Sequence, residues 1–327
     1  MTGLSDSFQR PINYLRISVT DRCNLRCIYC MPAGGIPTIP HRQILSYEEI
    51  RNIAAAAAEL GINKIRLTGG EPLVRAGLPR LIQMLAHLDV FDDISLTTNG
   101  TLLALYAAEL KSAGLHRVNV SLDTLQPDRF RQITRFGNLE DTLHGIAAAK
   151  AAGLNPVKVN MVVLAGINDD EIIDFAARTI DQEWHVRFIE LMPSAGSEVT
   201  SAQFVPVSQI RQRLEKLGRL EPCATSTGNG PASYFRLPGA TGTVGFITPV
   251  SEHFCFQCNR LRLTADGGLR PCLLNDEEID IKQALRNGAS TEELKQIIQQ
   301  ATARKPRAHR LSSGSAPHGR NFSQIGG

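Results

Sequence analysis

Short apolar segments rich in β-branched residues alternate with helical segments along the first two thirds of this chain. Strands that alternate with helices of this length favour a parallel sheet. About six such units predict an α/β fold, an incomplete (β/α)6 barrel of the TIM type. The expected strands are 12–19, 64–68, 93–97, 117–122, 157–163 and 185–191, and the expected helices include 78–88, 102–113 and 169–179, with an earlier one that opens at a Ser46–Glu49 capping box.

The composition changes after Pro193, where small, polar and Gly-rich stretches surround one expected helix, 207–217. A chain of 327 residues exceeds the usual size of one core, and a barrel with an appendage accommodates that length. We therefore expect a partial barrel over residues 1–193 and a C-terminal region over residues 194–327.

Composition and charge narrow the class of protein. Hydrophobic residues make up 43% and charged residues 20%, which is typical of a globular protein. A net charge of +3 is weak evidence for a polyanionic partner, so nucleic acid is not expected, whereas small phosphorylated ligands stay compatible. The first residues lack a signal-peptide pattern and the chain lacks a long apolar run, so we expect a cytoplasmic protein without a membrane partner.

Six of the seven cysteines fall into two triads, and Cys223 is left as an ordinary thiol. In a reducing compartment this grouping favours metal ligation over disulfides. Cys23, Cys27 and Cys30 have the spacing C-x3-C-x2-C directly after the first expected strand. Three thiolates can hold three irons of a [4Fe–4S] cluster and leave the fourth open for chemistry. The alternative is a zinc knuckle with a distant fourth ligand.

The second triad, Cys255, Cys258 and Cys272, has the spacing C-x2-C-x13-C and is accompanied by two arginines. A zinc ribbon would require a second cysteine pair where this chain has Cys272 alone. His253 could complete a zinc site instead. We interpret the triad as a second [4Fe–4S] site whose open iron faces substrate.

Polar residues follow several expected strands, where barrel folds place their chemistry. Gly69-Gly70-Glu71-Pro72 follows one strand, and its glycines allow a ligand to approach the backbone closely. The segments 97–100 and 121–123 offer groups for ribose and base edges, although such residues are also ordinary in turns and caps.

Single cations interrupt three apolar strands, at Arg16, Lys158 and Arg187. If these side chains converge inside the barrel they form a polyphosphate pocket, because guanidinium groups match phosphate oxygens. The alternative for each is a surface ion pair on an edge strand.

The segment CNLRCIYC, with Tyr29 immediately before the third cysteine, resembles the signature of the radical S-adenosylmethionine (SAM) superfamily. The resemblance implies that the open iron binds SAM and that one electron from the cluster releases a 5′-deoxyadenosyl radical. It also implies the partial barrel.

Together with GGEP, the C-x2-C-N-R-L-R-x9-C segment and the terminal Gly326-Gly327, the whole chain from about Tyr14 resembles the GTP 3′,8-cyclase family of radical SAM enzymes. The resemblance implies a lyase of molybdenum cofactor biosynthesis that removes H-3′ of GTP and forms (8S)-3′,8-cyclo-7,8-dihydroguanosine 5′-triphosphate. The closing glycines would enter the active site. By this resemblance Tyr29, Gly70, Ser121 and Met192 contact SAM, and Arg16, Lys64, Arg66, Thr97, Lys158, Arg187, Arg260, Leu261 and Arg262 contact GTP.

The implied partners are an electron donor, a downstream cyclic pyranopterin monophosphate synthase that receives the product, and a second copy of the chain in a homodimer. Two alternatives compete with this hypothesis. A radical SAM peptide-modifying enzyme would generally need more cysteines after the barrel. A non-catalytic protein with two structural zinc sites that binds nucleic acid would differ in its metal content.

Overall fold

The computed structural model describes residues 3–194, 197–224, 230–309, 311 and 319–326. Its twelve strands form one sheet in the order β12-β11-β10-β1-β2-β3-β4-β5-β6-β9-β8-β7. Six parallel strands carry the expected alternation: β1 (Tyr14–Ser18), β2 (Lys64–Thr68), β3 (Asp93–Thr98), β4 (Arg117–Ser121), β5 (Lys158–Val163) and β6 (His185–Glu190). The predicted α/β fold, in which parallel strands alternate with helices, is confirmed.

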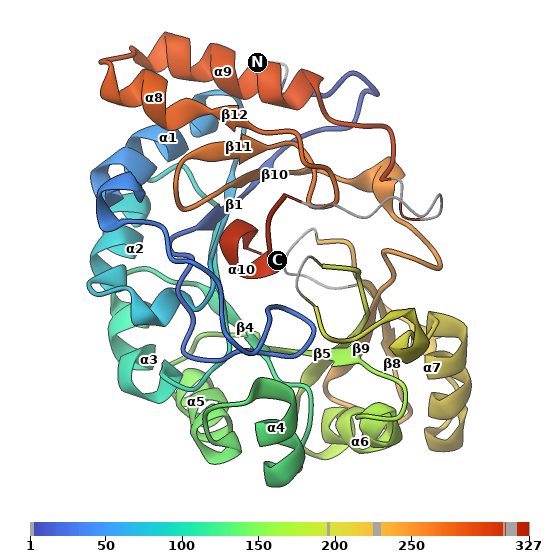
Figure 1. Ribbon diagram of the computed structural model, residues 1–327. Coiled ribbons are helices and arrows are strands. Elements are labelled where there is room, and N and C mark those ends of the chain that lie inside the picture. Colours follow the sequence, from blue (N-terminus) through green and yellow to red (C-terminus); the bar gives the residue numbers. More distant parts are fainter. Residues whose placement is uncertain (1–2, 195–196, 225–229, 310, 312–318, 327) are drawn as a thin grey trace.

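Helices cover the outside of this sheet, and the strands curve around a central space (Figure 1). The predicted capping box of the first helix is present, with the Ser46 side chain accepting from the Glu49 N–H. The outer helices are α1 (Tyr47–Glu59), α2 (Leu78–Ala86), α3 (Leu103–Ser112), α4 (Pro127–Thr134), α5 (Leu139–Ala151) and α6 (Ile172–Asp181).

The C-terminal region extends both ends of the parallel sheet. β9 (Thr243–Ile247) pairs with β6, and β10 (Arg260–Leu263) pairs with β1, both in parallel. Four short strands complete the edges antiparallel: β7 (Glu221–Pro222), β8 (Ser233–Arg236), β11 (Gly268–Arg270) and β12 (Ile279–Asp280). The two expected regions therefore share one sheet, and their division at residue 193 stays a prediction.

Four further helices belong to the C-terminal region. They are α7 (Val207–Leu214), α8 (Ile281–Arg286), α9 (Thr291–Ala303) and α10 (Phe322–Ile325). The short helix α10 lies inside the ring of strands, whereas α8 and α9 lie outside it beside α1 (Figure 1). The end of the described chain is thus brought into the interior.

The two-residue period of the strands separates the apolar core from the interior of the barrel. On β1, Leu15 and Ile17 belong to the buried apolar core, whereas Arg16 lines the internal cavity. β10 repeats this pattern, with Leu261 and Leu263 in the core. Cations at alternate positions of a strand can therefore face inward without disturbing the contacts between sheet and helices.

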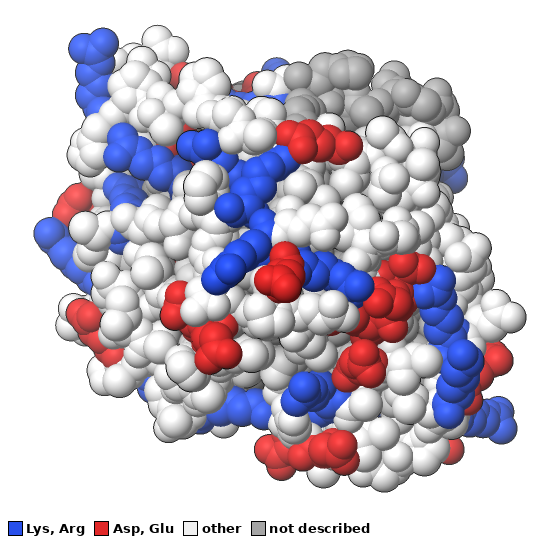
Figure 2. All heavy atoms as spheres, turned by 60° about the horizontal axis from the view of Figure 1, so that its bottom comes forward, with Lys and Arg blue, Asp and Glu red and all other residues white. Residues whose placement is uncertain are grey.

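No helix in the described part of the chain is both long and apolar enough to span a membrane. Basic and acidic side chains are interspersed on the face that Figure 2 shows.

His185, at the start of β6, makes the stability depend on pH. Burial lowers its pKa to about 4, and Lys158 and Lys150 contribute to the lowering. An unfolded histidine titrates near 6.5, so between about pH 6.5 and 4 the native state binds fewer protons than the unfolded state. The free energy of unfolding should therefore fall as the pH falls through this window.

Replacing His185 by Gln should reduce the loss of stability between pH 7 and pH 5 by about 1 kcal/mol, a figure discounted for partial exposure. Urea unfolding at the two pH values measures this effect, with His144→Gln, an exposed position, as the control. Equal pH dependence in the His185 variant and the unchanged protein would contradict the assignment.

Candidate functional site

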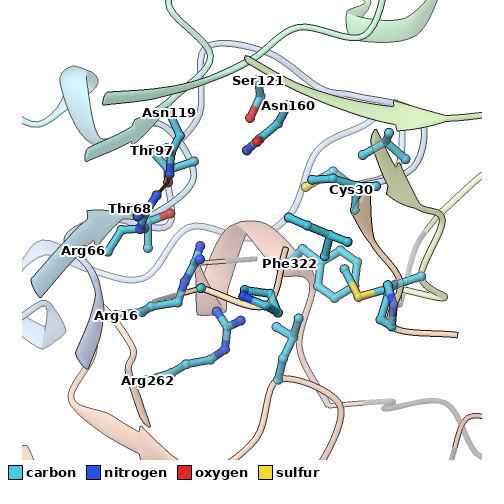
Figure 3. A pocket seen from close by; sticks show the side chains of 18 of the residues that line it. Arg16, Cys30, Arg66, Thr68, Thr97, Asn119, Ser121, Asn160, Arg262 and Phe322 are labelled. Atoms are coloured by element: carbon cyan, nitrogen blue, oxygen red, sulfur yellow. Dashed lines mark hydrogen bonds between the residues drawn. The ribbon is translucent and has the colours of Figure 1, made fainter. Parts of the chain in front are cut away.

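One cavity of about 310 Å³ lies inside the barrel, and both cysteine triads line it. The cavity brings together residues from opposite ends of the chain (Figure 3). Arg16 and Arg262 lie side by side on one side of it, and Cys30 lies across from them. None of the seven cysteines forms a disulfide.

The first triad follows β1, in the loop at the carboxyl end of the strand. Burial raises the pKa of Cys23 to about 12 and that of Cys30 to about 11. The pKa of Cys27 is shifted upward as well, with burial as the largest cause and negative charge on Asp123, Cys30 and Cys23 adding to it. These thiols are therefore protonated until a metal displaces their protons.

The donor set of this triad fits an iron–sulfur cluster, because soft thiolates select that chemistry and three of them line one cavity. Among the described residues, no three His, Cys, Asp or Glu side chains converge to hold a single metal ion. In a cluster each thiolate binds a different iron, so its ligands need not converge on one point.

Gly69 and Gly70 hold the loop after β2 against the cysteine loop. A Cβ on Gly69 would lie 2.5 Å from the Thr20 carbonyl oxygen, and one on Gly70 would lie 2.3 Å from that of Arg22. The Gly70 N–H donates to the Thr20 carbonyl at 2.8 Å. Only glycine permits this approach, so the GGEP segment fixes the backbone that carries Cys23.

The buried Glu71 side chain also holds these loops together. Its carboxylate accepts from the Thr98 hydroxyl and the Asn99 N–H, each at 2.7 Å. Burial raises its pKa to about 7, although these hydrogen bonds oppose the shift. Glu71 thus joins the ends of β2 and β3 beneath the first triad.

The four residues that the resemblance assigns to SAM, which are Tyr29, Gly70, Ser121 and Met192, all line the cavity. Tyr29 donates its hydroxyl to Asp123 at 2.7 Å, and Asp123 also accepts from the Val162 N–H at 2.8 Å. Burial raises the pKa of Asp123 to about 6.

Arginines from three neighbouring strands form a row on the other side of the cavity. Arg16 is in register with Arg66 on β2 and with Arg262 on β10. Burial, together with the charge of Arg260, lowers the pKa of Arg262 to about 10. The pKa of Arg16 is shifted downward by burial and then by Arg262. An anionic ligand would relieve this repulsion, as a phosphate does.

Thr97, Arg187 and Arg260 also line the cavity, whereas three residues assigned to GTP by the resemblance do not: Lys64, Lys158 and Leu261. Lys158 is buried; its ammonium donates to the Tyr234 hydroxyl at 3.2 Å and lies 5.0 Å from the centre of that ring. Leu261 is buried in the apolar core, because it alternates with the two inward arginines of β10.

Several lining residues were not singled out from the sequence. Asn119 on β4 and Asn160 on β5 line the cavity, and the two-residue period that places Ser121 inside also places them inside. Tyr14 also lines it and accepts a hydrogen bond from the Arg66 guanidinium. Lys305 carried no sequence signal, since it follows a helix far from any motif.

The C-terminal tail enters the cavity. Phe322 and Ser323 are among the lining residues. The Gly326 carbonyl accepts from Arg262 at 2.6 Å and from Arg16 at 3.1 Å. Gly326 has φ 66°, and a Cβ there would lie 2.4 Å from the Thr68 methyl group. Gly327, the other tail residue of the prediction, lies outside the described residues.

Ion pairs of Arg320 hold the tail in place just before it enters the cavity. Arg320 donates to both carboxylate oxygens of Asp266, at 2.9 and 3.0 Å, and to Glu278 at 2.6 Å. Hydrogen bonds to charged groups contribute about 1.5–3 kcal/mol. Arg320→Met should therefore increase the amide exchange rate of residues 322–326 by roughly tenfold or more.

Hydrogen exchange followed by mass spectrometry measures that change, and Arg304→Met is the matched control because Arg304 is exposed and 3.6 Å from Glu277. Unchanged exchange in the Arg320 variant would show that the tail is held by its other contacts.

The second triad differs electrostatically from the first. Although burial raises the pKa of Cys258, the neighbouring Arg260 and Lys305 lower it to about 6. The pKa of Cys272 is shifted upward, chiefly by burial. Cations beside a cysteine favour the thiolate, which is the form that binds metal.

Comparison with known proteins agrees with this site. Residues 17–179 match the Radical SAM superfamily, and residues 184–311 match the family Molybdenum Cofactor Synthesis C. Proteins named GTP 3′,8-cyclase from Pelotomaculum thermopropionicum and Moorella thermoacetica are each 54% identical to it, over 99% of this chain and 100% of the relative. SuiB of Streptococcus suis, bound to S-adenosylmethionine, has a similar fold, with a TM-score of 0.61 at 12% identity over 87% of this chain and 68% of that chain.

The likeness to SuiB concerns the fold, whereas the match to the two named relatives extends over nearly the full length of both partners. The family expected from the motifs is thereby confirmed. The chain belongs to the GTP 3′,8-cyclase family of the radical SAM superfamily.

Proposed function

We propose that this chain is a lyase that converts GTP into 3′,8-cyclo-7,8-dihydroguanosine 5′-triphosphate in molybdenum cofactor biosynthesis. The observation that carries the proposal is a single cavity lined by both cysteine triads and by the row of arginines. The names of the relatives supply the substrate and the reaction.

In this proposal Cys23, Cys27 and Cys30 hold a [4Fe–4S] cluster with an open iron for SAM. When bound, the reduced cluster and SAM supply a 5′-deoxyadenosyl radical able to remove H-3′ of the ribose. Tyr29, Gly70, Ser121 and Met192 surround SAM. Cys255, Cys258 and Cys272 hold a second [4Fe–4S] cluster that faces the guanine. Soft thiolate donors at both places support this assignment.

The protein's own residues then bind and orient the nucleotide. Arg16, Arg66 and Arg262 clamp the triphosphate by charge-assisted bidentate hydrogen bonds, which strengthen inside a buried cavity. Arg187, Arg260 and Thr97 complete the clamp. Holding C3′ beside the radical source requires this fixed geometry, since orientation supplies much of the rate enhancement.

Exclusion of water is the second task of these residues, because a radical must meet only its substrate. The tail, with Gly326 and Gly327, closes the cavity in this proposal, and the Gly326 carbonyl already contacts two arginines of the clamp. The assignments of Lys64, Lys158 and Leu261 to GTP stay predictions from the resemblance.

The proposal extends to the partners. We expect a cytoplasmic homodimer that accepts electrons from a separate donor protein and passes its product to a cyclic pyranopterin monophosphate synthase. Reducing surroundings suit the two triads of free cysteines.

The test is anaerobic. The protein is prepared with iron and sulfide, analysed for both and for zinc, reduced, and incubated with SAM with and without GTP. GTP-dependent release of 5′-deoxyadenosine together with cyclised nucleotide supports the proposal. Stoichiometric zinc without sulfide would favour the zinc-protein alternative. Release of 5′-deoxyadenosine that does not depend on GTP would favour a different substrate.

A further inference from the structure

Two buried cations next to the second triad belong neither to the barrel strands nor to the family motifs described above. Lys305 follows α9 and is 3% exposed, and Arg10 lies before β1 and is 6% exposed. A lysine or arginine is seldom buried this deeply unless its donors are all engaged. What these two cations contact therefore indicates what they do.

Lys305 ties together the two segments that carry the second triad, 255–260 and the one with Cys272. Its ammonium donates to the Arg260 carbonyl at 2.8 Å and to the Pro271 carbonyl at 2.7 Å. The Arg260 carbonyl lies two residues after Cys258, and the Pro271 carbonyl immediately precedes Cys272. An ammonium has three donors, and these two contacts direct two of them to the backbone beside Cys258 and Cys272.

Arg10 ties the remaining cysteine to the same point. Its guanidinium donates to the Cys255 carbonyl at 2.6 Å, to the Pro306 carbonyl at 2.7 Å and to the Arg307 carbonyl at 3.0 Å. Its fourth contact is the buried Asp6, at 2.6 Å, which balances its charge. In Figure 1 the segment that leaves α9 runs to the loop before β10, where these contacts are made.

The two cations have different electrostatic consequences. Arg10 is neutralised by Asp6 and contacts only backbone carbonyls near the triad. Lys305 donates to two carbonyls, one two residues after Cys258 and one immediately before Cys272, so its charge lies close to both of these cysteines. Charge and hydrogen bonding at the sulfurs are among the factors that set the reduction potential of an iron–sulfur cluster. A cation close to the cysteines stabilises the reduced cluster, which carries one more negative charge.

We infer that Lys305 is a positioning residue that fixes the separation of Cys258 and Cys272 and raises the reduction potential of the cluster held by the second triad, while Arg10 fixes Cys255 without affecting the potential. This inference rests on the proposed second cluster. It assigns to the segment at 305–307 a role in metal binding that is separate from binding of the nucleotide.

The test isolates the second site in the full-length chain by replacing Cys23, Cys27 and Cys30 with Ala. In this background Lys305→Met and Lys305→Gln remove the charge, and Lys305→Arg keeps it. Lys216→Met is the matched control, because Lys216 is exposed. Iron and sulfide per chain, release of iron to a chelator and an EPR-monitored redox titration are measured without SAM or GTP.

We expect both neutral variants to shift the reduction equilibrium toward the oxidised cluster by about tenfold, which is about 59 mV for one electron. Lys305→Met should also release iron several-fold faster, and Lys305→Gln less so because its amide still donates to the carbonyls. Lys305→Arg should keep the potential. The paired change Asp6→Asn with Arg10→Met should speed iron release and leave the potential unchanged.

A potential in Lys305→Gln equal to that of the Lys216→Met control would overturn the inference while leaving the proposed function intact. Equal shifts in Lys305→Gln and Lys305→Arg would overturn the role of the charge. Zinc without sulfide in the parent background would remove the second cluster itself, and with it both this inference and that part of the proposed function.

Discussion

Replacing Cys23 by Ala is expected to abolish SAM cleavage, so that formation of 5′-deoxyadenosine falls by more than about 100-fold. The reason is that changes to the partners of metal ligands already cost about 10- to 100-fold in affinity or activity, and Cys23 is proposed as a ligand itself. Chromatographic measurement of 5′-deoxyadenosine in reduced, anaerobically reconstituted protein with SAM and GTP tests this result.

The result for Cys23→Ala is compared with that for Cys272→Ala. Loss of the second site should leave some SAM cleavage, uncoupled from the nucleotide, while the cyclised product disappears. Cys223→Ala is the matched control, since Cys223 is a free thiol that does not line the cavity. If Cys23→Ala and Cys272→Ala lost SAM cleavage equally, the division of labour between the two triads would be wrong.

Gly326→Ala should lower formation of the cyclised nucleotide by about 100-fold, which is the effect expected when an active-site group is displaced by about 1 Å. The added Cβ would lie 2.4 Å from the Thr68 methyl group, so the tail must move away from Arg16 and Arg262. Product formation and cluster content are measured together, and the iron content should not change.

Two further variants separate this clash from simple backbone strain. Gly239 has a similar positive φ, 71°, but open space around it, so Gly239→Ala carries the strain of a positive φ without the clash and should keep its activity. Thr68→Ser removes the methyl group that the added Cβ would meet, so combining it with Gly326→Ala should restore part of the activity. A fully active Gly326→Ala protein would contradict the proposed role of the tail.

The local patterns of the sequence were sufficient for the six parallel strands β1 to β6 and for the cysteine triads, whereas β7 to β12 were not predicted. Lys64–Thr68 was expected and found as a strand with the same bounds, because apolar residues at a two-residue period, here Ile65 and Leu67, indicate a strand without reference to the rest of the chain. The capping box at Ser46 and Glu49 was equally local. Such features depend on residues a few positions apart.

The sequence motifs were a less reliable guide to the face of the strand on which each side chain lies. The segment from Arg260 to Arg262 matched the family as a block, yet the strand turns Leu261 into the apolar core and its neighbours into the cavity. GGEP was interpreted through SAM, whereas the structure adds close packing of Gly69 and Gly70 on the cysteine loop. A motif specifies residue types, and only the pairing of strands determines which face each residue occupies.

From the amino-acid sequence alone came the alternation of strands and helices, the two sets of three cysteines and the family to which they point. Only the tertiary structure decided that both triads open into one cavity, that Arg16 meets Arg262 across β1 and β10, and that Lys305 and Arg10 hold the second triad. The physical reason is distance along the chain. Spacing within one segment is set by local backbone geometry, whereas contacts between remote segments arise from packing of the whole sheet.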